Sequence, residues 1–173
     1  MAIYALGSIE PSIDPSAYVH PDAVVIGEVT IGAESSVWPT AVLRGDPGGI
    51  VVGARTSVQD GTVVHTTPIH PTRIGDECVI GHLVHLEGCT VGNGVLVGSG
   101  AIVLNGAVLE DECLVGAGAL VPGSLTVPSR AMALGVPATL KHDAVRPEAH
   151  IRIGMEVYRE RGRTYREQLR RID

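Results

Sequence analysis

The chain is 173 residues long, and its 13 basic and 19 acidic side chains give a formal net charge of −6. That length suits one domain with a sizeable core. Phenylalanine is absent, aromatic residues make up 3% of the chain and there are 22 glycines, so the core has to be built from small aliphatic side chains.

Composition also argues against a membrane span and a disulfide scaffold. No stretch reaches the roughly 18 uninterrupted apolar residues of a transmembrane helix. The opening MAIYALGSIEP lacks the basic and apolar regions of a signal peptide. Three cysteines fit no closed set of disulfides, so a reducing, cytoplasmic location is expected.

From position 13 onward an aliphatic residue recurs with a period of six. Four positions after most of these residues comes a small or β-branched side chain, and glycine often follows directly. A period of six fits neither an α-helix nor a single strand. It fits short strands joined by bends and stacked in coils, each strand sending one large and one small side chain inward. The aliphatic series is Ile13, Val19, Val25, Ile31, Val37, Leu43, Val52, Val58, Val64, Ile74, Ile80, Leu86, Val91, Val97, Val103, Leu109, Val115, Val121 and Val127.

The period is interrupted in three places. There are three extra residues between positions 43 and 52, four extra between 64 and 74, and one too few between 86 and 91. Interruptions in a regular scaffold are where function is usually placed. The second and third interruptions adjoin a segment, VIGHLVHLEGCTVG, that is rich in potential metal ligands.

After Pro137 the repeat stops and apolar residues fall at helical spacings. We therefore predict an amphipathic helix that starts after Pro147 and packs on the coils. The chain divides into a β-helix domain, 1–140, and a helical segment, 141–173. The last thirty residues carry eight arginines, but these alternate with five acidic residues, which is typical of a solvated helix face and not of a nucleic-acid surface.

The repeat places three polar residues in one column. Arg44, His65 and Glu87 each directly follow an aliphatic residue of the same side, so stacking in register sets them about 4.8 Å apart. His82 precedes Glu87 by five residues, a path of about 15 Å at ~3.3 Å per residue. Ligands of one zinc ion at ~2.1 Å can hardly be so far apart. His82 would therefore complete a site on a neighbouring subunit, and threefold symmetry would give three equivalent sites.

The six-residue pattern resembles that of hexapeptide-repeat proteins. The resemblance implies an all-β solenoid, a left-handed parallel β-helix with three strands per triangular coil, followed by the C-terminal α-helix. The inward residues would fill about seven coils at roughly 4.8 Å each.

Short motifs further resemble the γ-class carbonic anhydrases and their bacterial and archaeal relatives, and the likeness covers essentially the whole chain. It implies a homotrimer with Zn²⁺ or Fe²⁺ between subunits, held by three histidines, two from one chain and one from its neighbour. His65 and His82 fall on two of the ligand positions. The motifs are LRGD (43–46), SVQD (57–60), VVH (63–65) and IGH (80–82) followed by EGC.

The same resemblance assigns four supporting residues. Arg44 and Asp46 match a pair that the family uses across the trimer interface. Gln59 and Asp60 match residues that surround the metal-bound water and position the arginine. Ser57 belongs to the same group, although active members of the family usually have asparagine there.

Position 87 is the other departure, because the family's usual third histidine is replaced by Glu87. Two histidines and one glutamate form a recognised catalytic zinc set, so Glu87 is a candidate third ligand. It could instead be a solvated acid, and His85 is an alternative ligand. A carboxylate ligand would lower the charge of the metal centre and weaken its activity.

The sequence thus predicts a γ-carbonic anhydrase-like lyase that hydrates CO₂ reversibly to bicarbonate by a metal-bound hydroxide. No membrane or nucleic-acid partner is expected. Two other classes remain open: an acyl-CoA-dependent acetyltransferase, which is common among hexapeptide solenoids, and a catalytically inactive trimeric structural or assembly protein.

Overall fold

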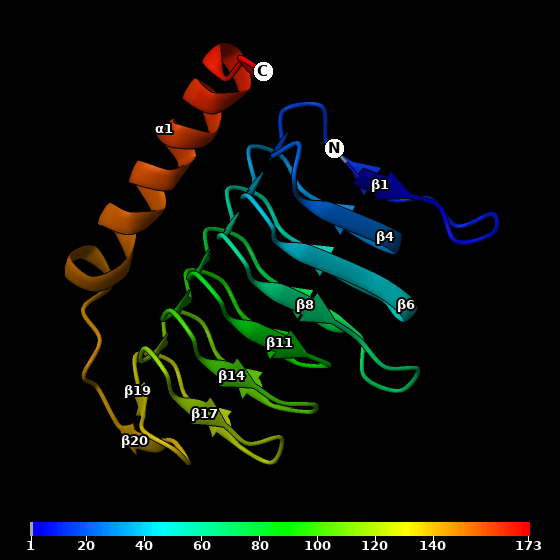
Figure 1. Cartoon of the computed structure of the whole chain (residues 1–173). Helices are drawn as coiled ribbons and strands as arrows, with labels where there is room; N and C mark the ends of the chain where they lie inside the picture. The colour runs from blue at the N-terminus through cyan, green and yellow to red at the C-terminus, as the bar shows by residue number, and fades with distance from the viewer. Residues whose placement is uncertain (1) are drawn as a thin grey trace.

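The computed structural model describes residues 2–173. Short parallel strands stack in coils along a prism, and a single long helix lies beside the upper coils (Figure 1). One side of the prism is a stack of seven parallel strands, one for each coil, as the repeat predicts. These strands are β3 (Tyr18–Val19), β5 (Ser36–Val37), β7 (Ser57–Val58), β10 (Val79–Ile80), β13 (Leu96–Val97), β16 (Leu114–Val115) and β19 (Met132–Leu134).

A second stack, here called the first side, contains the predicted column of polar residues. Its two upper strands are long and turn the corner, so their second halves begin the remaining side of the prism. The first side consists of β4 (Val24–Ile31), β6 (Val42–Val52), β8 (Val63–His65), β11 (His85–Glu87), β14 (Ile102–Val103) and β17 (Leu120–Val121).

The remaining side continues from the second halves of β4 and β6, and three further strands close the two ends. β1 (Ala2–Tyr4) and β2 (Ser12–Ile13) pair with β4, and β20 (Thr139–Lys141) pairs antiparallel with β19. The remaining side consists of β9 (Thr72–Ile74), β12 (Thr90–Val91), β15 (Val108–Leu109) and β18 (Thr126–Val127).

The core is the inward ladder that the six-residue period predicts. From Val25 to Val127 every aliphatic residue of the series is 2% exposed or less. The three cysteines are buried in the same core, and burial raises the pKa of the Cys78 thiol to about 12. A narrow interior of this kind has room for one layer of small side chains from each wall, which accounts for the absence of phenylalanine.

The helical segment also forms as predicted. A π-helical turn, η1 (Glu148–Arg152), leads into α1 (Ile153–Gln168), which packs against β3, β5 and β7. Trp38 stacks edge-on against Tyr158 and Tyr165, with ring centroids 5.6 and 5.0 Å apart. Arg159 and Arg163 of the helix both pair with Glu34. Within residues 2–173 no helix is long and apolar enough to cross a membrane.

We expect Leu86→Ala to lower the free energy of unfolding by about 2–5 kcal/mol, because it removes a fully buried side chain from a core with no room to collapse. Urea unfolding at fixed protein concentration measures the change. Leu83→Ala is the matched control, since Leu83 is 71% exposed in the preceding turn. Its effect should stay within about 0.5 kcal/mol. Equal losses for the two variants would contradict the inward ladder.

Candidate functional site

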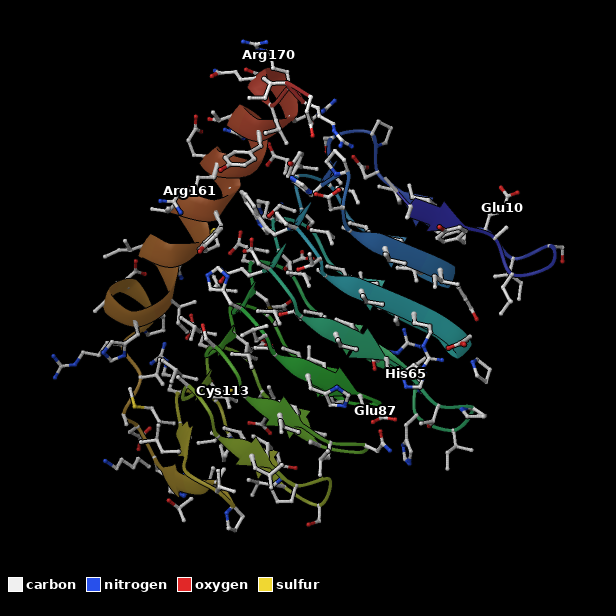
Figure 2. All side chains as sticks on the ribbon, viewed as in Figure 1. Glu10, His65, Glu87, Cys113, Arg161 and Arg170 are labelled. Atoms are coloured by element: carbon white, nitrogen blue, oxygen red, sulfur yellow. The ribbon has the colours of Figure 1, made fainter. Side chains whose placement is uncertain are left out.

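The strand register confirms the predicted column. Arg44 of β6 lies opposite His65 of β8, and His65 lies opposite Glu87 of β11. His65 and Glu87 end their strands at one edge of the first side (Figure 2). Residues that are 22 positions apart in sequence are therefore direct neighbours in space.

His65 lies between two carboxylates. Its Nδ1 is 3.4 Å from Oε1 of Glu87, and its Nε2 is 3.3 Å from Oδ1 of Asp46. The approach to Glu87 has the geometry of a hydrogen bond, whereas the buried Nε2 makes no hydrogen bond within residues 2–173. The ring therefore has one satisfied nitrogen and one unsatisfied nitrogen.

Asp46 comes from the first interruption of the repeat. The register between β4 and β6 passes from the Gly27–Gly45 pair to the Val29–Ile50 pair, so residues 46–49 of β6 face one residue of β4 and three of them are extra. Nη1 of Arg44 donates to both oxygens of Asp46 at 2.7 Å. The hydrogen bond and positive charge of Arg44 hold the pKa of the Asp46 carboxyl below its ordinary value. The resemblance implies that this pair bridges subunits, but here it forms within one chain.

Glu87 also contacts two imidazoles. Its second oxygen, Oε2, lies 3.2 Å from Nε2 of His85, which shares its face two residues earlier in β11. The hydrogen bond with His85, followed by that with His65, lowers the pKa of the Glu87 carboxyl and outweighs its partial desolvation. Glu87 is thus an ionised carboxylate held at both oxygens.

The backbone beneath this edge is fixed by the second interruption. The hydroxyl of Thr72, fully buried, donates to the carbonyl of His65 and accepts from the N–H of Gly88 at 2.8 Å. Gly88 has a φ of +57°, and a side chain there would meet Oδ1 of Asn105 at 2.6 Å. Glycine is therefore required after Glu87, and the strand ends there in a defined position.

His82 lies apart from this cluster, in the turn between β10 and β11. Its Nδ1 is 2.9 Å from Oδ2 of Asp60, one coil above, and its Nε2 is 3.3 Å from the hydroxyl of Tyr158 of α1. Asp60 is therefore in place to orient this imidazole. His82 shares none of these partners with His65.

Ser57 and Gln59, the remaining predicted site residues, precede Asp60 by three residues and one residue. The hydroxyl of Ser57 accepts a hydrogen bond from Nε1 of Trp38 at 3.0 Å, so it is committed to packing of the helix side. Gln59 is 2% exposed, and its buried Nε2 has no hydrogen-bond partner within residues 2–173.

One chain brings only part of the predicted metal centre together. Within residues 2–173, no three His, Cys, Asp or Glu side chains converge as a metal site. His65 and Glu87 meet, His85 joins them, and His82 occupies a separate position. The donor chemistry nevertheless suits a divalent cation, because a buried imidazole nitrogen without a partner is a ligand atom that zinc accepts.

Sequence reasoning missed two contacts of this region. Tyr158 is one of the residues that fall at helical spacings after Pro137, but that spacing cannot show that it meets His82, because the period of a helix does not fix which coil it lies against. Trp38 was also not linked to Ser57. The contact of Tyr158 with His82 depends on where the helix docks, whereas that of Trp38 with Ser57 joins neighbouring coils.

Comparison with known proteins agrees with the fold and with the motifs. The family model described as bacterial transferase hexapeptide (six repeats) matches residues 71–105 and 88–123. The solved structure of a hexapeptide transferase family protein from Anaplasma phagocytophilum superposes with a TM-score of 0.90 at 36% identity, over 95% of this chain and 98% of that one.

Two curated relatives are similar in sequence. The carnitine operon protein CaiE of Escherichia coli is 36% identical over 150 residues, covering 87% of this chain and 76% of the relative. Gamma carbonic anhydrase 1, mitochondrial, of Arabidopsis thaliana is 44% identical over 134 residues, 74% of this chain. The chain spans about half the length of that plant protein, since the match covers 49% of it.

The stacked coils, their register and these likenesses define a left-handed parallel β-helix of the hexapeptide-repeat class. Within that class, the chain belongs to the γ-class carbonic anhydrase-like family, which the motifs around positions 44, 60, 65 and 82 first indicated.

We expect Arg44→Ala to raise the pKa of the Asp46 carboxyl toward its ordinary value of about 3.9, because Arg44 is the main cause of its lowering. Carboxyl carbon NMR titration measures it, with Lys141→Ala as a charge-matched control at the far end of the prism. A lowered folded pKa stabilises the fold above the unfolded pKa, and this contribution is lost as pH falls through the folded value. An unchanged Asp46 titration would contradict the pair.

Proposed function

We propose that the protein is a homotrimeric, metal-dependent enzyme of the γ-carbonic anhydrase type that interconverts CO₂ and bicarbonate. Each metal ion, Zn²⁺ or Fe²⁺, would lie between His65 of one subunit and His82 of the neighbouring subunit, with Glu87 at the place of the family's third histidine. The observation that carries the proposal is the position of these half-sites at opposite edges of the first side of the prism, with His65 at the strand ends and His82 in the turn before β11.

An outward column that is apolar except for His85 separates the two half-sites. Successive strands of the first side align in register and present Val24, Val42, Val63, His85, Ile102 and Leu120. Val63 and Ile102 are 37% and 40% exposed in the single chain. Aligned apolar side chains on a sheet face favour a covering partner. A second copy packed here by threefold rotation would bring its His82 edge toward the His65 edge of the first.

The residues at each half-site suit the metal and its chemistry. Among residues 2–173, Nε2 of His65 is buried without a hydrogen bond, and Nδ1 of His82 lies beside Asp60, which can orient the ring. Carboxylates that orient histidine ligands in this way are common around protein-bound metals. A bound zinc or iron ion would act as a Lewis acid that makes water nucleophilic at neutral pH.

The chain's own groups would position the reactants. In the described part of the chain the buried Nε2 of Gln59 is a donor without a partner, so it would be available to bind an oxygen of CO₂ or bicarbonate. Arg44 and Asp46 form a hydrogen-bonded ion pair beside His65, which would line the site. Reactants held by such preset donors need little reorganisation during the reaction.

The tests below distinguish the proposed activity from two other functions. The similarity to a protein described as a hexapeptide transferase favours acyl transfer. The substitutions at Ser57 and Glu87 favour a trimer that has lost catalysis. A cytoplasmic location also stays a prediction.

The trimer is tested by Ile102→Asp, which places a charge in the apolar column. We expect the wild-type protein to have the mass of three chains in light scattering, and the variant to dissociate, because a buried unpaired carboxylate is costly. Ile153→Asp is the control, since Ile153 is 66% exposed on α1, away from the first side. It should remain trimeric. A monomeric wild-type protein would end the proposal.

Metal dependence and activity are tested together on the purified trimer. We expect about one zinc or iron ion per chain by elemental analysis, and its loss in His65→Ala. CO₂ hydration should be weak in the wild-type protein and about tenfold or more faster in Glu87→His, which restores a third imidazole; tenfold corresponds to about 1.4 kcal/mol of barrier.

Three results would contradict this account. Equal and high activity of the wild-type and Glu87→His proteins would show that position 87 is no handicap. Binding and turnover of acetyl-CoA without metal would favour the transferase. A metal-free trimer after purification with added zinc would favour the structural protein.

A further inference from the structure

We infer that Glu87 serves the metal centre through His65 and not as a ligand. Its carboxylate accepts the Nδ1 proton of His65, fixes the orientation of the ring and leaves Nε2 as the metal-binding atom. Each centre then has two protein ligands, His65 and His82 of the neighbouring subunit. This inference rests on the proposed metal-dependent function and changes the ligand set that the sequence predicts for it.

The first support is the direction of the contact. Oε1 of Glu87 lies 3.4 Å from Nδ1 of His65, while the nitrogen without a hydrogen bond is Nε2. The two nitrogens of an imidazole point away from each other. A carboxylate on Nδ1 therefore lies behind the ring as seen from a metal on Nε2, where it can hold the proton that fixes the tautomer.

The alternative is a metal shared by Nδ1 of His65 and Glu87. A separation of 3.4 Å would also suit two ligands of one tetrahedral ion. That arrangement, however, puts the ring proton on Nε2, whose 3.3 Å approach to Oδ1 of Asp46 lacks the geometry of a hydrogen bond within residues 2–173, whereas the approach of Nδ1 to Glu87 has it. A metal on Nε2 with Glu87 on Nδ1 satisfies both ring nitrogens.

The second support is that Glu87 is held where it is. Its Oε2 contacts Nε2 of His85 at 3.2 Å, so both carboxylate oxygens have imidazole partners. The backbone on either side is tied down because Thr72 bonds both the carbonyl of His65 and the N–H of Gly88. His85, the alternative ligand by sequence, thus becomes the residue that positions Glu87.

The consequence concerns affinity. Zinc in catalytic sites commonly has three protein ligands, so a centre with two should bind the ion less tightly and leave two positions to small molecules. On this account, glutamate in place of histidine at position 87 weakens the affinity of the centre for the metal ion. Loss of an orienting carboxylate typically costs 10–100-fold in metal affinity.

The test measures Zn²⁺ affinity by competition with a chromophoric chelator, using the full-length trimer. Glu87→Gln should bind within about tenfold of the wild-type protein, because an amide oxygen can still accept from Nδ1. Glu87→Ala should bind about 10–100-fold more weakly. His65→Ala should lose stoichiometric binding, and Glu167→Ala, an exposed carboxylate of α1, should bind normally. Loss of binding in Glu87→Gln equal to that in His65→Ala would make Glu87 a ligand and overturn the inference.

A second readout locates the proton. In zinc-loaded protein labelled with ¹⁵N-histidine, His65 should show a proton on Nδ1 and the metal on Nε2, and this Nδ1–H should exchange faster in Glu87→Ala. A metal on Nδ1 overturns the inference alone and leaves the proposed function standing. Wild-type trimers that bind no Zn²⁺ overturn both. The two failures are therefore distinguishable.

Discussion

The parallel register between coils is the constraint on which this molecule depends. Each strand bonds to the strand one coil away, so residues 21 or 22 positions apart in β6, β8 and β11 become lateral neighbours. The buried ladder holds that register, because a slip of one residue would turn every aliphatic side chain outward. The polar column of Arg44, His65 and Glu87 is thus fixed by apolar residues on the other face of the same strands.

Much of this could be predicted from the sequence because the period is explicit. The six-residue spacing gave the coils, the inward residues and the adjacency of His65 and Glu87. It could not give side-chain directions at the strand ends. Asp46 lies in residues that have no counterpart in the repeat, and the choice of His65 nitrogen that faces Glu87 depends on rotamers. These local choices decide between a ligand and an orienting carboxylate.

The C-terminal helix α1 packs on the coils next to His82. α1 docks on the stack of seven strands through Trp38, and the same docking brings Tyr158 to His82, while the indole N–H of Trp38 donates to the Ser57 hydroxyl. Residues near the proposed centre therefore depend on the helix as well as on the coils. Substitution of Ser57 by the larger asparagine would have to be accommodated within this contact, because Ser57 is 3% exposed.

Trp38 is the single tryptophan of the chain, and three tyrosines and two serine hydroxyls surround it. Its fluorescence consequently reports on the seam between helix and prism without any added label. A shift of its emission to longer wavelength would signal that this seam has opened and the indole has met water. The molecule thus carries an intrinsic optical probe beside the histidine that the neighbouring subunit would need.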